Sequence, residues 1–202
     1  MFAFHAAGGG EDGLGMDVTL LVLRLVPGLL FIGHGLQKLV PGRYSPRLLA
    51  ATGPGPMSGA FESMGLRPGV VAVVLAGLGE LAGGILVAAG LVTPLGTAIL
   101  AAVMTTAILA VHLKKGIWST GGGFEFPLLM LTAVYAVSAL GPGSLSVDAW
   151  AGISNWAGIH WDAGNAARAG AAVGVGAAAG LLTMAFGRVQ SDAGSTISPE
   201  GS

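Results

Sequence analysis

The 202-residue chain contains no cysteine. This absence excludes disulfides, thiolate metal sites and any thiol relay within the chain itself. Charge is also scarce, since only 9% of the residues are Asp, Glu, Lys or Arg, against about 25% in a typical soluble domain. A surface with so little charge does not suit one large soluble core. The formal net charge of −1 offers no basic face for nucleic acid.

What the chain has instead is apolar: 53% of its residues are hydrophobic and the mean hydropathy is +0.78. A helix needs about 20 mostly apolar residues to cross a hydrocarbon core roughly 30 Å thick. Four stretches meet or approach this length, at 18–40, 70–92, 94–113 and 124–140. A fifth at 168–186 is rich in Ala and Gly and is also expected to span. We therefore predict an all-α transmembrane helix bundle, with a four-helix core and a fifth helix.

The flanking segments differ from these spans in composition. Residues 1–15 are Gly-rich and lack the basic region of a secretory signal, so we expect a flexible tail, with Met16 an alternative start. The membrane core should occupy 16–145, and a Trp-rich segment with the fifth helix should occupy 146–187. Residues 188–202 have little to bury, which favours a disordered tail.

Orientation in the membrane follows from Lys and Arg in short loops, which favour the cytoplasm. Arg43, Arg47 and Arg67 lie between the first two spans, and Lys114 and Lys115 lie between the third and fourth. The loops on the other side carry no Lys or Arg. The pattern predicts a multi-pass membrane protein with its N-terminus outside and both basic loops in the cytoplasm, and with the lipid bilayer as its first partner.

The outer segment carries three tryptophans, Trp150, Trp156 and Trp161. Tryptophan favours the headgroup region because its ring is apolar and its N–H is polar. We interpret the segment as one that lies along the membrane surface, with anchoring as its simplest role. His160 lies within it and is expected to be a solvated interface residue.

Ionisable groups inside a span are costly and usually face a partner within the bundle. Glu80 lies near the middle of the second span, beside small residues such as Gly77 and Gly84 that let another helix approach closely. Arg24 lies at a comparable depth on the first span. We therefore predict an Arg24–Glu80 intramembrane pair, which either fixes helix register or handles protons.

A second polar group ends the first span, in "LLFIGHGLQKLVPG". His34, Gln37 and Lys38 share one helical face because they lie at positions i, i+3 and i+4. The predicted orientation brings His112 and Glu125 to the same membrane side. Lys38 could simply extend to the headgroups and Glu125 could simply cap its helix. Taken together, the five residues form a candidate polar cluster.

Such a cluster allows several kinds of chemistry. A quinone headgroup needs polar donors at the end of an apolar cavity with a proton donor nearby, and His34, Gln37 and Glu125 match that description. Two histidines can ligate a haem or metal, but their spacing shows no ligand signature, so no metal site is predicted. A transport path would also be lined by polar groups, although no inverted repeat is visible.

The segments "RLVPGLLFIGHGLQKL", "LAGLGELAGGILVAAGLVTPLG", "VHLKKGIW" and "GGGFEFPLLML" resemble the DoxX family of small bacterial membrane proteins. The resemblance runs from about Met16 to Leu145 and implies a four-helix membrane core. The positions that match the family pattern are Arg24, His34, Gly35, Gln37, Lys38, Glu80, His112, Gly123, Glu125 and Pro127.

The resemblance also implies association with redox systems. The family name comes from an archaeal quinol oxidase and thiosulfate:quinone oxidoreductase, and mycobacterial relatives are linked to a complex with superoxide dismutase and a sulfurtransferase. The family has no agreed catalytic set. We therefore expect a membrane subunit of a redox complex, with quinone as the candidate cofactor and catalysis left open. The alternatives are a non-catalytic anchor for soluble redox enzymes and a transporter of small solutes or protons; self-association is also open.

Overall fold

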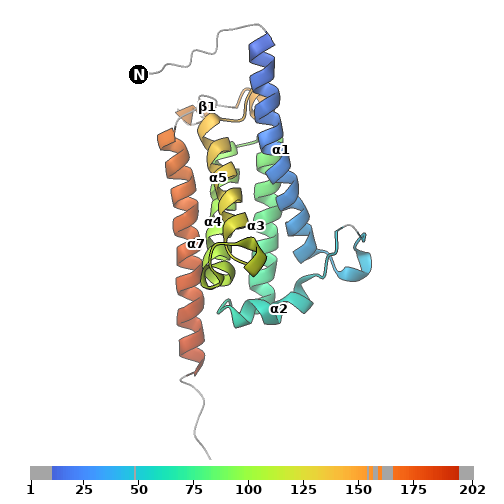
Figure 1. Ribbon diagram of the computed structural model, residues 1–202, viewed down its shortest axis with the longest axis vertical. Coiled ribbons are helices and arrows are strands. Elements are labelled where there is room, and N and C mark those ends of the chain that lie inside the picture. The colour runs from blue at the N-terminus through green and yellow to red at the C-terminus, as the bar shows by residue number, and fades with distance from the viewer. Residues whose placement is uncertain (1–10, 48, 154, 157–158, 161–165, 196–202) are drawn as a thin grey trace, which may run out of the picture.

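The computed structural model describes residues 11–47, 49–153, 155–156, 159–160 and 166–195. Five long helices alternate in direction along the bundle (Figure 1). They are α1 (Glu11–Leu39), α3 (Gly69–Ala89), α4 (Thr93–Ala107), α5 (Glu125–Leu140) and α7 (Ala166–Ser195). Four helical stretches in this part of the chain are long and apolar enough to cross a membrane, and α5 is a shorter apolar helix. The predicted all-α bundle is confirmed.

The connections contain shorter elements. Between α1 and α3 lie a 3₁₀ turn, η1 (Gly42–Tyr44), and the helix α2 (Pro54–Ser63), which the hydrophobic pattern does not predict. A π-helical turn, η2 (Ile108–His112), ends α4 and leads into two 3₁₀ turns, η3 (Leu113–Lys115) and η4 (Ser119–Gly121). After α5 come α6 (Val147–Ala151) and a hairpin of β1 (Asn155–Trp156) and β2 (Ile159–His160).

Two predicted boundaries are wrong. The helix α1 begins at Glu11, inside the segment 1–15 expected to be a flexible tail, and α7 continues to Ser195, past the expected start of the C-terminal tail at 188. In each case a helix already formed by the apolar stretch extends into a polar flank, because each added residue contributes another backbone hydrogen bond. Trp161 and the side chains of Trp156 and His160 lie outside the described part of the chain.

Helices α1, α3, α4 and α5 pack as a ring in that order, and α7 covers α4 and α5 from outside (Figure 1). Glycines allow α1 and α3 to meet closely: a Cβ on Gly35 would lie 2.7 Å from the Gly77 carbonyl oxygen. A Cβ on Gly84 would lie 2.8 Å from the Gly28 carbonyl oxygen. The small residues around Glu80 therefore do accommodate a neighbouring helix, as predicted.

The side chains sort as a bilayer requires. Between the ring helices lies a core of Phe31, Val87, Leu100, Met104, Val134 and Val137. The opposite face of α1 exposes a stripe of large apolar residues, Leu14, Val18, Val22, Val26 and Leu29. An exposed apolar stripe along a span is suited to lipid contact. Trp150 on α6 is 88% exposed, which agrees with an anchoring role at the membrane interface.

The alternating helices give the bundle two distinct ends (Figure 1). One end, here called the basic end, holds α2 and the α4–α5 connection, with Arg43, Arg47, Arg67, Lys114 and Lys115. The other, the α6 end, holds the α3–α4 turn and the segment from Gly141 to Ile153. The ionisable groups of the bundle gather near these two ends.

Candidate functional site

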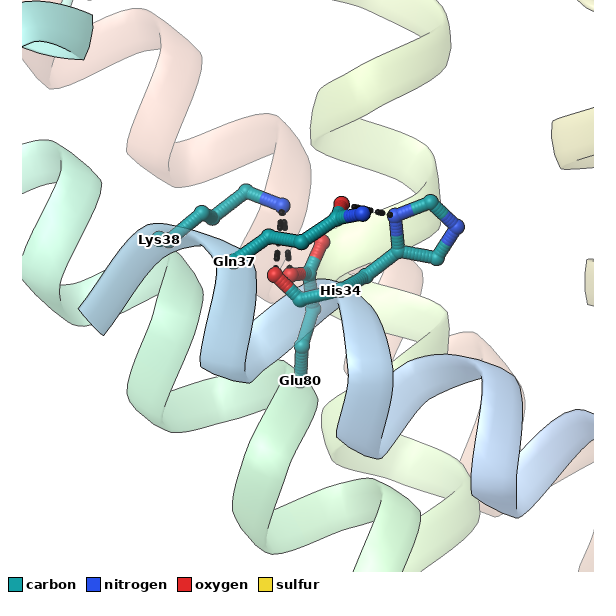
Figure 2. A network of polar contacts seen from close by, with 4 residues as sticks. All are labelled: His34, Gln37, Lys38 and Glu80. Carbon is teal, nitrogen blue, oxygen red and sulfur yellow. Dashed lines mark hydrogen bonds and ion pairs between the residues drawn. The ribbon is translucent and has the colours of Figure 1, made fainter. Parts of the chain in front are cut away.

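Glu80 pairs with Lys38, and the predicted Arg24–Glu80 pair is wrong. Lys38 Nζ lies 2.6 Å from Glu80 Oε2 and 3.4 Å from the His34 carbonyl oxygen (Figure 2). The Glu80 side chain is buried, with only 5% of the residue exposed, so it does face protein as expected. Its partner comes from the last turn of α1 rather than from the middle.

The antiparallel register of α1 and α3 explains this exchange of partners. Gly28 packs against Ala88 and Gly35 packs against Gly77 and Leu81, so each step forward on α1 corresponds to a step back on α3. This register puts Arg24 level with the end of α3 and Glu80 level with the last turn of α1. The depth of a residue along its own apolar stretch does not include this offset between the two helices, so it predicts the wrong partner for Glu80.

Arg24 belongs instead to a buried network at the α6 end. Its Nη1 donates to the Ala88 carbonyl at 3.2 Å and its Nη2 donates to the Leu145 carbonyl. Asp148 is the negative charge that acts on it electrostatically. The Asp148 carboxylate accepts hydrogen bonds from Val92 N–H at 2.8 Å and from the Thr93 hydroxyl at 3.3 Å. We call Arg24, Asp148 and Thr93 the α6-end clasp.

The clasp joins the α3–α4 turn to the segment after α5. Arg24 and Asp148 are 1% and 0% exposed, and Asp148 N–H also donates to the Gly90 carbonyl at 3.0 Å. Ser146, which caps α6, lies in the same buried layer. Since its polar atoms bond mainly to backbone, the clasp serves to close this end of the bundle.

The basic end contains a cavity of about 680 Å³. Apolar side chains from α1 to α5 form most of its wall, among them Leu30, Phe61, Leu75, Val103 and Met130. Leu75 and Phe126, which line it, are 64% and 44% exposed, so the cavity borders the lipid-facing surface. The ionisable residues in its wall are His34, Lys38, Arg67, Glu80 and His112.

Three of the five residues of the predicted cluster line this cavity: His34, Lys38 and His112. Gln37 does not, but it lies beside the first histidine, with its Oε1 3.2 Å from His34 Nδ1 (Figure 2). The Gln37 carbonyl also accepts from Thr52 N–H at 3.1 Å, which fixes the loop after α1. Gln37 therefore contacts a cavity-lining histidine without lining the cavity itself.

Glu125 is also separate from the cavity wall. Its Oε2 accepts from Ser119 N–H at 2.9 Å, and its own N–H donates to the Ile117 carbonyl at 2.8 Å. Gly123 fits against Gly116 in the same loop, where a Cβ would lie 2.3 Å from the carbonyl oxygen. Glu125 thus organises the α4–α5 connection at the start of α5.

His112 reaches the cavity from the π-helical turn η2. A π turn contains an extra residue, so it rotates the following side chains relative to a regular α-helix, and such turns are frequent at functional sites. His112 Nδ1 lies 2.7 Å from the Gly122 carbonyl oxygen, which fixes the ring against the glycine-rich loop. The hydropathy pattern of the sequence does not predict this π turn.

Two further contributors were not identified from the sequence. The sequence identifies Arg67 only as one of the basic residues between the first two spans, yet it lines the cavity just before α3. The helix α2 closes the basic end because Gly69 N–H donates to Glu62 Oε1 at 3.0 Å and Gly69 packs on Ser58. Among the residues that the structure describes, no group of three His, Asp or Glu residues could hold a metal ion.

Comparison with known proteins agrees with the architecture. Residues 19–113 match the DoxX family model. This range includes Arg24, His34, Lys38, Glu80 and His112, and ends before the "GGGFEFPLLML" segment. No curated protein and no solved structure matches the chain.

Proposed function

From the match of residues 19–113 to the DoxX family model, we propose that the chain is a DoxX-family membrane subunit of a redox complex whose cavity binds a quinone. The observation that carries this proposal is the cavity at the basic end. It combines apolar walls with ionisable side chains in a multi-pass membrane protein. The family's frequent association with redox systems supports the same reading.

The size and position of the cavity suit a ring carried on an apolar tail. Small-molecule sites typically measure about 300–1,000 Å³ and use few polar groups to orient a ligand, and this cavity of about 680 Å³ lies within that range. Its border with exposed Leu75 and Phe126 would let a lipophilic molecule enter from the bilayer. The ligand need never cross water.

The polar groups supply complementary contacts for a quinone head. Lys38 Nζ has three N–H donors, of which Glu80 and the His34 carbonyl occupy two. The third donor can reach a ligand oxygen. The pairing with Glu80 also lessens the cost of keeping the ammonium within the bundle.

The test is binding by the purified protein in lipid nanodiscs. Short-chain ubiquinone and menaquinone analogues are titrated while thermal unfolding is followed, with an alkyl alcohol of equal tail length as control. A ligand at one hundred times its Kd stabilises the folded state by about 2.7 kcal/mol. We expect at least one quinone to raise the unfolding temperature more than the alcohol. Identical curves for quinones and alcohol would refute the proposal.

A second candidate, a non-catalytic anchor for soluble redox enzymes, is favoured by the exposed cations of the basic end. Arg43, Arg47, Arg67, Lys114 and Lys115 are all exposed there. They also support our proposal that this end faces the cytoplasm of a bacterial inner membrane. Because the chain has no cysteine, the single-cysteine variants Arg47→Cys and Trp150→Cys can report topology. Labelling of Trp150→Cys from the cytoplasmic side would show the opposite orientation. Soluble enzymes that co-purify without any quinone effect would favour the anchor.

A further inference from the structure

His112 differs from the other cavity histidine in how its ring is held. The group facing its Nδ1 is the Gly122 carbonyl, at 2.7 Å. A carbonyl oxygen can only accept, so Nδ1 must carry the hydrogen. In the neutral ring Nε2 is then a bare acceptor, and no partner for it is found among the described residues. His34 faces an amide side chain, which can present either an oxygen or an N–H group.

The surroundings hold the His112 ring with its Nδ1 hydrogen on the Gly122 carbonyl. Gly122 has a φ of +76°, in the left-handed region that glycine adopts readily. This loop conformation sets the direction of the Gly122 carbonyl. The Glu125–Ser119 hydrogen bond fastens the same loop from the other side. The π turn brings the ring to the cavity wall. The site therefore offers one fixed acceptor, in addition to the donor on Lys38.

An acceptor in that wall discriminates between the two forms of a quinone. A quinol hydroxyl donates a hydrogen bond to a bare nitrogen, whereas a quinone carbonyl presents lone pairs to it and leaves both unsatisfied. The Lys38 ammonium does not discriminate in the same way, because the oxygens of both forms can accept from it.

We propose that His112 Nε2 accepts a hydrogen bond from a ligand hydroxyl, so that the cavity binds the quinol form more tightly than the quinone. This inference rests on the proposed function and assigns His112 as the residue that determines specificity. The loss of one such hydrogen bond corresponds to a change of about tenfold in Kd. The wild-type ratio of quinone Kd to quinol Kd is expected to be of that order.

The experiment measures both dissociation constants in nanodiscs under anaerobic conditions. In His112→Asn the side-chain N–H₂ occupies the place of Nδ1 and keeps the Gly122 bond, but nothing replaces Nε2. We expect the Kd ratio to fall close to one in this variant. Lys114→Asn, at an exposed side chain outside the cavity wall, is the control and should keep the wild-type ratio. An unchanged ratio in His112→Asn, or a ratio that falls equally in Lys114→Asn, would overturn the proposal.

A measurement on the wild type removes dependence on the variant's folding. In ¹⁵N-histidine-labelled protein the His112 Nε2 resonance, assigned by comparison with His112→Asn or by its coupling to the ring, should shift on adding quinol and move little with quinone. Equal shifts with both forms would contradict the assignment. If the wild type binds neither form, the proposed function itself fails; if it binds both equally, only the role of His112 fails.

Discussion

Each end of the bundle encloses a cation and a carboxylate at least in part, yet the two arrangements differ in what surrounds them. At the α6 end Arg24 and Asp148 are almost wholly enclosed, and their described hydrogen bonds go mainly to backbone groups of several segments. At the basic end Lys38 and Glu80 bond to each other beside a cavity of about 680 Å³. The amino-acid types are similar, but the space next to them is not.

This contrast separates a structural use of buried charge from a functional one. The Asp148 carboxylate accepts from both Val92 and Thr93 and so holds the α3–α4 turn in place. Glu80 accepts from one described side chain, Lys38, and faces the cavity. A buried charge committed to several protein partners stabilises the fold, whereas one beside an apolar cavity can also meet a ligand.

The largest expected effect breaks the α6-end clasp. Asp148→Ala removes the acceptor for Val92 and Thr93 and leaves Arg24 buried without its countercharge. Each buried donor left without its acceptor typically costs about 1–3 kcal/mol, and both Val92 and Thr93 lose theirs here. We expect a loss of that order in the free energy of unfolding, measured by denaturant titration in detergent. Thr93→Ser, which keeps the hydroxyl, is the control; an Asp148→Ala protein as stable as the control would show that the clasp does not close the bundle.

An intermediate effect is expected where α1 and α3 touch near the basic end. In Gly35→Leu the new side chain meets the Gly77 carbonyl and Leu81, and overpacking of this kind costs about 1–3 kcal/mol. The displaced helices should also separate Lys38 from Glu80 while the distant clasp stays intact. Gly33→Leu is the matched control, because a Cβ there meets nothing within 4 Å. Equal unfolding temperatures for the two variants would argue against this close contact.

The smallest effect sharpens the choice of partners. A double-mutant cycle with Lys38→Met and Glu80→Gln should give a coupling energy of about 1 kcal/mol or more, since contacting residues couple in the range of about 0.5–3 kcal/mol. The cycle with Arg24→Met and Glu80→Gln should give a value near zero, because no contact joins them. Unfolding of the single and double variants supplies both numbers. A reversed order would restore the pair predicted from the sequence.

Much of the fold could be predicted because hydropathy and length report directly on membrane spans. The five apolar stretches correspond to α1, α3, α4, α5 and α7. The helix α2 is not predicted because its ten residues, Pro54–Ser63, include two glycines and two serines and so resemble a loop in composition. The helix ends were also misplaced, since fraying polar flanks carry no apolar signal.

The candidate site was predicted less completely, for a geometric reason. Spacing correctly grouped His34, Gln37 and Lys38, because one helix alone decides which residues share a face. The partner of Glu80 depends on the register between two helices, which glycine contacts set and hydropathy does not reveal. Arg67 and the π turn before His112 likewise acquire their meaning only in three dimensions.

The most direct test of the central claim is to fill the cavity and measure quinone binding. Ala76 lines the cavity one turn from Glu80, and Ala171 is exposed on α7. Quinone Kd is measured in nanodiscs for Ala76→Phe and Ala171→Phe, after both are shown to unfold at temperatures near the wild type. We predict that Ala76→Phe weakens binding by about tenfold or more, since a contact worth 1.4 kcal/mol changes Kd tenfold, while Ala171→Phe leaves it unchanged. Equal affinities for the two variants would contradict the assignment of this cavity as the quinone site.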